Sequence, residues 1–123
     1  MRIALVLAAT AALACVSAIA AATPPVPISD SDLRVAYFGA PLITNRQAKA
    51  VPAGITQRQL SRRLHGRSAN WDRTSHGRAW KICITYPVKG SGVKYADGFV
   101  TADEWEFCFG FNGRLKRKFF TPV

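Results

Sequence analysis

The stretch Trp105–Phe120, WEFCFGFNGRLKRKFF, decides the fold of this chain. Its first half places aromatic residues at alternate positions from Trp105 to Phe111, and its second half follows Leu115 with a run of cations. A period of two is typical of β-strands with one buried face, and Asn-Gly between two such runs indicates a tight hairpin. The stretch therefore predicts an antiparallel hairpin whose aromatic face packs on a core.

The register of this hairpin follows from its charges. A two-residue turn at Asn112-Gly113 would set three cations on the aromatic face, where burying unpaired charge is costly. A three-residue loop, 111–113, with Gly113 left-handed and forming a bulge, shifts the register by one residue and leaves Arg117 on the core-facing side. This register pairs Phe109 with Leu115, Trp105 with Phe119, and Glu106 with Lys118.

A second alternating run, Trp80–Tyr86, predicts another strand of the same sheet. Its Trp and Ile residues share one face, which leaves Cys83 on the opposite face, as the aromatic alternation also leaves Cys108. An even pair of cysteines in an exported chain indicates a disulfide, and neighbouring strands bring residues of one face within bridging reach. We therefore expect a Cys83–Cys108 disulfide. The connection Lys89–Glu104 is long, with a small hairpin at its tip.

Two short helices are expected before the sheet. Thr44 caps the first, Asn45–Val51, which ends before a proline. Thr56 and Gln59 form the capping box of the second, which stops at Gly66. The predicted fold class is α+β, with two short helices packed on one face of a three-stranded antiparallel sheet and one disulfide.

The N-terminal 22 residues have the pattern of a secretory signal peptide: an early cation, an apolar run and A-x-A cleavage sites ending at Ala22. An alternative is a lipid anchor at Cys15, but the apolar residues after it favour ordinary cleavage. Residues 23–41 are expected to form an extended Pro-rich leader with a short strand at Leu33–Phe38. Residues 42–123 then form one domain, in a protein that is exported and peripheral to a membrane at most.

The formal net charge of +10 suggests acidic partners. One basic region could meet anionic lipid headgroups or an acidic protein face, although a solvated surface is the plain alternative. This candidate contact region comprises Arg58, Arg62, Arg63, Arg67, Arg73, Arg78 and Lys81. A second candidate lies on the hairpin and comprises Arg114, Lys116, Lys118 and Phe120. There, protection of an edge strand is the favoured interpretation.

No enzyme is expected. His65 and His76, with Lys81, could serve as the acid and base of a small secreted ribonuclease, but no acidic residue is placed to orient either histidine. Neither histidine has carboxylate partners at metal-ligand spacing. We therefore expect no catalytic residues, no metal and no cofactor. Nucleic acid is not an expected partner either, because the hairpin aromatics are assigned to the core.

Three quoted segments carry a resemblance to a known family: LITNRQAKAVPAGITQRQLSRRLHG (42–66), AWKICITYPV (79–88) and EWEFCFGFNGRLKRKFF (104–120). Their order resembles the SmpA/OmlA (BamE-like) family. The resemblance implies an α-α-β-β-β module that binds partners without catalysis. It also implies a place in the periplasm or at the periplasmic face of the outer membrane, where the family supports β-barrel assembly and envelope integrity and contacts assembly subunits and anionic phospholipid.

The same module occurs in β-lactamase-inhibitor proteins, which carry one disulfide per module. A secreted protein inhibitor is therefore the alternative function. A small basic secreted nuclease or toxin is a remote third.

Overall fold

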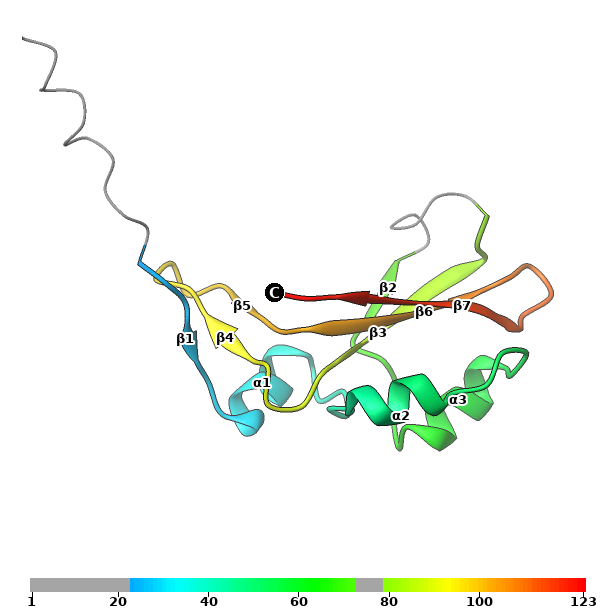
Figure 1. Cartoon of the computed structure of the whole chain (residues 1–123), viewed down its shortest axis with the longest axis horizontal. Helices are drawn as coiled ribbons and strands as arrows, with labels where there is room; N and C mark the ends of the chain where they lie inside the picture. Colours follow the sequence, from blue (N-terminus) through cyan, green and yellow to red (C-terminus); the bar gives the residue numbers. More distant parts are fainter. Residues whose placement is uncertain (1–22, 73–78) are drawn as a thin grey trace, which may run out of the picture.

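The computed structural model in Figure 1 describes residues 23–72 and 79–123. The expected signal peptide and the anchor alternative at Cys15 lie outside the described residues, as do Arg73, His76 and Arg78. The helices are α1 Asp30–Ala36, α2 Asn45–Ala50 and α3 Gln57–Arg63. The strands are β1 Val26–Pro27, β2 Asn70–Asp72, β3 Ile82–Pro87, β4 Val93–Lys94, β5 Val100–Thr101, β6 Glu104–Phe109 and β7 Leu115–Thr121.

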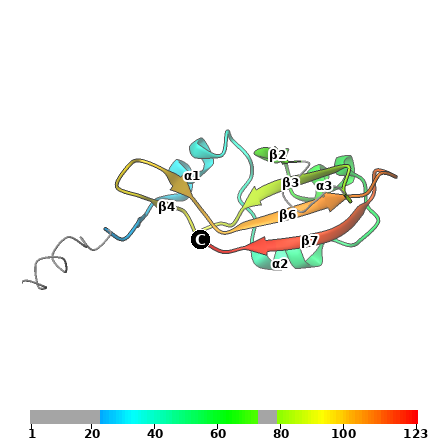
Figure 2. The ribbon, with the colours of Figure 1, turned by 90° about the horizontal axis from the view of Figure 1, so that it is seen from above.

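The main sheet is antiparallel with the strand order β2-β3-β6-β7, and α2 and α3 cover one of its faces (Figures 1 and 2). The predicted α+β class and the three predicted strands β3, β6 and β7 are confirmed, with β2 as an additional edge strand. The core between helices and sheet contains the fully buried side chains of Leu60, Tyr86, Phe107 and Phe109.

Local capping explains where the two helices of this layer begin. The Thr56 hydroxyl accepts from the Gln59 amide nitrogen at 3.2 Å, and the Gln59 side chain accepts from the Thr56 amide at 2.9 Å, which confirms the predicted capping box. Thr44 and Gln47 form the same motif at the start of α2. Each box satisfies amides that a helix N-terminus leaves without partners.

Helix α1 corrects the strand predicted at Leu33–Phe38. Ser29 caps it by accepting from the Asp32 amide at 3.1 Å, and acidic residues in its first turn favour the helical N-terminus. Leu33 and Tyr37, four residues apart, are both buried on one side of this turn of chain. The segment 23–41 is therefore not simply an extended leader, because it contributes the strand β1 and the helix α1 to the fold.

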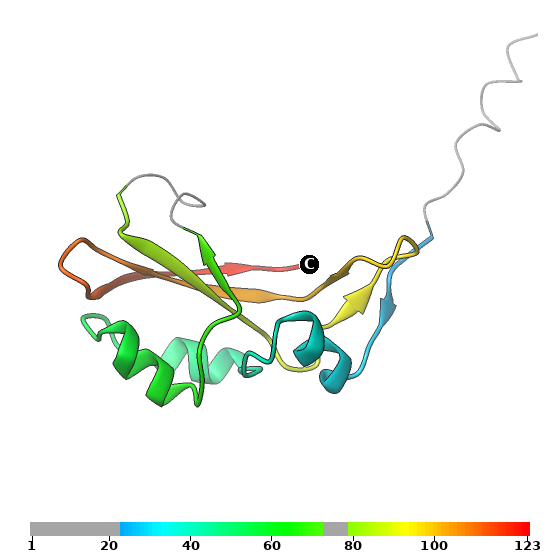
Figure 3. The same ribbon diagram turned by 180° about the vertical axis from the view of Figure 1, so that it is seen from behind.

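A small second sheet with the order β1-β4-β5 lies beside α1, at the opposite end of the molecule from the β6–β7 turn (Figure 3). Its β4 and β5 form the small hairpin predicted within Lys89–Glu104. A second apolar cluster joins it to α1 and comprises Leu33, Tyr37, Ala40 and Ala102, with half-buried neighbours such as Ile28 and Val100.

The β6–β7 hairpin agrees with the predicted register near its turn and departs from it further along. Gly113 is left-handed with φ of 77°, and Phe109 pairs with Leu115, as predicted. Lys116 is then an extra residue, because Cys108 pairs with Arg117. This second irregularity moves every later pair by one position.

The remaining register predictions are therefore wrong. Trp105 pairs with Phe120, Glu106 with Phe119, and Phe107 with Lys118. Arg117 consequently lies on the face of the cysteines and Lys118 on the face of the helices, the reverse of the prediction. Phe111, expected on the buried face, lies in the turn and is 72% exposed.

Candidate functional site

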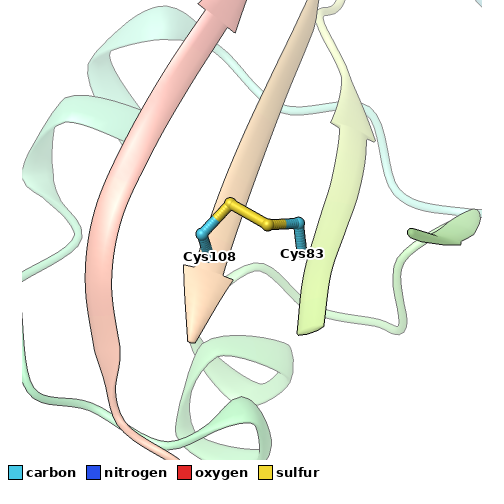
Figure 4. The surroundings of a disulfide bond; sticks show 2 residues. All are labelled: Cys83 and Cys108. Carbon is cyan, nitrogen blue, oxygen red and sulfur yellow. A yellow bond between two sulfur atoms is a disulfide. The ribbon is translucent and has the colours of Figure 1, made fainter. Parts of the chain in front are cut away.

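The disulfide lies on the sheet face that points away from the helices. Cys83 and Cys108 are direct cross-strand partners with a Cα–Cα distance of 4.1 Å, and both side chains are fully buried (Figure 4). The predicted disulfide is confirmed. Its position fastens the two central strands of the main sheet, so it has a structural role in this fold.

An aromatic pair lies on the same face as the disulfide. The rings of Trp80 and Phe119 meet edge to face at 6.2 Å, and the Arg117 guanidinium lies 5.0 Å from the Phe119 ring centre. Phe119 shares the face of Glu106 because the two are cross-strand partners. The sequence predicts both aromatic side chains on the helix-facing side of the sheet, and this prediction is wrong. The extra residue at Lys116 moves Phe119 to the opposite face. Trp80 lies before the first residue of β3, outside the regular alternation of that strand.

The Glu106 carboxylate and the two sulfur atoms of Cys83 and Cys108 lie within 4.8 Å of one another, the one such grouping among the described residues. Metal ions bind thiolates, and both sulfur atoms here are already joined in the disulfide. The grouping leaves a single carboxylate as a ligand, so it does not form a metal site.

Two cations predicted as contact residues instead cap the end of α2. The Lys118 ammonium donates to the carbonyl oxygens of Ala48, Lys49 and Val51, at 3.1, 2.9 and 3.0 Å. The Arg63 guanidinium donates to Ala50, at 3.2 Å. The last carbonyls of a helix have no intrahelical partners, so these cations satisfy them. Desolvation lowers the pKa of Lys118 from its ordinary value.

The other hairpin candidates also make contacts within the chain. Arg114 donates to the Gly54 carbonyl at 2.9 Å, and the aliphatic part of Lys116 lies over Gly110. Phe120 is 42% exposed and packs its ring 5.2 Å from that of Trp105. The hairpin cations are largely structural. The loop 54–56 additionally pairs with the start of β7 and so covers part of that edge.

A polar anchor that sequence reasoning missed fixes the Trp105 ring. Its indole nitrogen donates to the Asn45 side-chain oxygen at 2.8 Å, at the start of α2. These two residues, with Lys49 and Phe120, line a small hollow of about 220 Å³. A buried indole N–H needs an acceptor, but only the fold shows which residue supplies it.

The basic region of the sequence opens onto a groove between α3 and β3. Two adjoining cavities of about 530 and 380 Å³ share Gln57 and Arg58 in their walls. We call them the α3–β3 groove. Its described lining residues are Thr56, Gln57, Arg58, Ser61, Arg67, Ser68, Lys81, Ile82, Ile84, Phe109 and Gly113.

Three predicted contact residues, Arg58, Arg67 and Lys81, line this groove and are exposed. Among residues 23–69 and 79–123, whose side chains the structure describes, these three side chains have no hydrogen-bond or ion-pair partner. No carboxylate occurs among the described lining residues. Arg62 is exposed on α3 and lines neither cavity. The predicted basic region is therefore divided: three cations gather at the groove, while Arg63 caps α2.

The described histidine lies apart from the groove. His65 follows α3 in a left-handed conformation, with φ of 65°, and is exposed. It borders a shallow cavity with Asp30, but the Asp30 carboxylate accepts from the Gly90 amide at 2.8 Å. The placement gives no acid–base pair in the described residues.

Exposed apolar side chains in and near α1 are a feature that the sequence analysis did not predict. Val35, Phe38 and Phe99 are 78%, 90% and 62% exposed, and the two phenylalanines border a cavity of about 300 Å³. Tyr37 lies beside this cavity, and its hydroxyl donates to the Glu104 carboxylate at 2.6 Å. Burial raises the pKa of the Tyr37 hydroxyl well above its ordinary value, and the Glu104 carboxylate raises it further.

Comparisons with protein-family models, with curated proteins and with solved structures found no match. Among the described residues, no helix is long and apolar enough to cross a membrane. The case for a function therefore depends on the geometry of the groove and on the order of the elements around it.

Proposed function

We propose that this chain is a non-catalytic, exported binding protein of the cell envelope, of the kind found in the SmpA/OmlA family, which supports outer-membrane β-barrel assembly and envelope integrity. The observation that carries the proposal is the α3–β3 groove. Arg58, Arg67 and Lys81 surround its apolar floor, without partners among the described residues. Such a groove is suited to a ligand or partner of opposite charge.

The arrangement of the main layer supports the family resemblance. Helices α2 and α3 precede the antiparallel strands β3, β6 and β7, and both helices lie on one face of the sheet (Figure 2). These five elements follow the α-α-β-β-β order that the resemblance implies, with β2 inserted before β3 and the β4–β5 hairpin inserted before β6. Fold alone does not determine function, so the groove carries the argument.

A pull-down from Gram-negative envelope extract tests the proposal. The bait is the exported chain with its disulfide intact, and the comparison is the variant R58Q/R67Q/K81Q. We expect the wild-type chain to retain an envelope protein that the variant releases. Failure of the wild-type chain to retain any envelope protein would contradict the proposed function.

Localisation is tested separately by fractionation after treatment with globomycin, which blocks processing of lipoprotein precursors. Ordinary signal cleavage predicts a processed form with and without the inhibitor. Accumulation of a precursor would instead indicate acylation at Cys15.

The disulfide within the module favours a second candidate, a secreted inhibitor of the β-lactamase-inhibitor kind. Cys83 and Cys108 join neighbouring strands of one module, as expected for that group. The second candidate predicts a soluble secreted form that inhibits a purified β-lactamase at stoichiometric concentration. Undiminished β-lactamase activity at excess protein would exclude that inhibitory function.

A further inference from the structure

We propose that the α3–β3 groove binds an extended acidic segment of a partner protein, with carboxylates at Arg58, Arg67 and Lys81 and apolar side chains on the floor between them. The inference rests on the proposed binding function and names the class of partner. It concerns residues that come from three parts of the chain and meet at this groove.

The first step is the electrostatics of the groove. Arg58 comes from α3, Arg67 from the connection after it, and Lys81 from the residue before β3. Like charges gathered around one recess repel one another, and no described lining residue carries a compensating carboxylate. An acidic ligand would relieve this repulsion.

The second step is the contrast with cations elsewhere in the chain. Arg63, Arg114 and Lys118 each donate to backbone carbonyl oxygens at 2.9–3.2 Å. The three groove cations have no such partner within the described residues. Capping of the fold therefore accounts for the first set and not for the second, which leaves the groove cations for an external anion.

The third step is the floor. Ile82 and Ile84 line the recess with only 4% of their surface exposed, and Phe109 adds to this apolar lining, which we call the floor. Gln57, Ser61 and Ser68 add hydrogen-bonding groups to the walls. An extended polypeptide turns alternate side chains to opposite sides, so its carboxylates and apolar side chains can meet different parts of one groove.

The shape of the recess also favours a peptide over a membrane. A bilayer presents a broad surface of headgroups, which can meet the exposed cations of the rim. It cannot also contact Ile82 and Ile84, since these line the recess and are only 4% exposed. A single segment of chain can contact the rim and the floor together.

The test uses the oxidised chain and a fluorescently labelled peptide in which Glu and Leu alternate. We expect saturable binding by fluorescence anisotropy, falling with added salt because the contacts are ionic. Replacing every Glu of the peptide by Gln is expected to weaken binding about tenfold or more, and the variant R58Q/R67Q/K81Q is expected to show the same loss.

A charge-matched control separates the groove from the net charge of the protein. The variant R46Q/R62Q/K94Q also removes three exposed cations, all outside the groove, and is expected to bind like the wild type. The charge-reversed variant R58E/R67E/K81E is expected to lose the Glu peptide and to bind a Lys–Leu peptide instead. That gain would show that the variant is folded.

Several outcomes would overturn the inference: no saturable binding of the Glu peptide by the wild type, equal binding of the Gln peptide, or equal losses in the two triple variants. Binding of phosphatidylglycerol-containing vesicles with no peptide binding would also overturn it, in favour of a lipid surface. If an envelope protein is retained equally by wild type and R58Q/R67Q/K81Q, the groove inference fails and the proposed function stands. If the chain binds the peptide but retains no envelope protein, the groove inference stands and the proposed function fails.

Discussion

The side-chain nitrogen of Lys118 lies 3.0 Å from the carbonyl oxygen of Val51, so the last strand of the sheet is joined to the end of α2. The same ammonium reaches Ala48 and Lys49, and it therefore serves three carbonyls at a helix terminus. A cation near the C-terminal end of a helix is also favoured by the helix dipole. One side chain thus holds an element of the helical layer against the edge of the sheet.

Replacing Lys118 by Met is therefore expected to destabilise the fold. Hydrogen bonds from a charged donor contribute about 1.5–3 kcal/mol, and part of that loss is recovered because water reaches the freed carbonyls. We expect the free energy of unfolding in urea to fall by about 1–2 kcal/mol. Lys116→Met, two residues away on an exposed position, is the matched control and is expected to stay within about 0.5 kcal/mol of wild type. Equal effects of the two substitutions would contradict the capping role.

The disulfide gives a second prediction. Cys83 and Cys108 are separated by 25 residues, and closing a loop of this size stabilises a fold by about 3–4 kcal/mol on the chain-entropy model. The double substitution to Ala is expected to lower the free energy of unfolding by about that amount. In the oxidised chain, denatured without reductant, neither cysteine should react with a thiol reagent. Two titrating thiols would disprove the bond.

Local signals allowed much of the helical layer and the central sheet to be predicted. The capping box of Thr56 and Gln59 involves residues three apart, and the cysteine pair follows from alternation within two strands. Helix α1 has a comparable signal, a serine cap at Ser29 followed by acidic residues in the first turn. The apolar residues of Leu33–Phe38 also fit a short strand, so the prediction there was wrong although the cap is visible in the sequence.

The register of β7 had no comparable signal. A single extra residue at Lys116 reverses the faces of Arg117 and Lys118, and the alternation of the sequence does not mark it. The groove was predictable only in part. The sequence predicts one basic region that includes Arg58, Arg67 and Lys81, but the recess that these three residues line depends on the packing of α3 beside β3.

The free energy of unfolding is expected to fall at alkaline pH because of the buried hydroxyl of Tyr37. Its pKa is raised in the folded state, by burial first and by the Glu104 carboxylate second, whereas an unfolded tyrosine titrates near pH 10. Above about pH 10 the unfolded chain releases a proton that the folded chain keeps. The stabilisation is therefore complete below pH 10 and is lost as the pH rises through the folded value.

The measurement is urea unfolding from pH 8 to 11, with Tyr37→Phe as the comparison. At pH 8 the free energy of unfolding of this variant should be about 1 kcal/mol lower than that of the wild type, because the variant lacks the hydrogen bond to Glu104. Above pH 10 its free energy of unfolding should fall less steeply with pH than that of the wild type. Parallel curves for the two proteins would contradict the argument.

The turn of the β6–β7 hairpin gives a backbone prediction. Gly113 has φ of 77°, a conformation that costs other residues roughly 1–2 kcal/mol, although its neighbourhood has space for a Cβ atom. Gly113→Ala is expected to lower the free energy of unfolding by about 1 kcal/mol through backbone strain alone. Gly113→Asn is expected to cost less, since asparagine tolerates this region. Thermal unfolding distinguishes the two.

Phe38 gives the converse prediction, a substitution that stabilises. It has φ of 55° and is 90% exposed, so the fold bears the strain of a left-handed aromatic residue with almost no burial in return. Phe38→Asn should raise the free energy of unfolding by about 0.5–1 kcal/mol, because asparagine adopts this conformation readily. Val35→Asn is the control: it removes another exposed apolar side chain from a helical position and should destabilise slightly. A loss of stability in Phe38→Asn would show that the aromatic ring makes a stabilising contact that its exposure conceals.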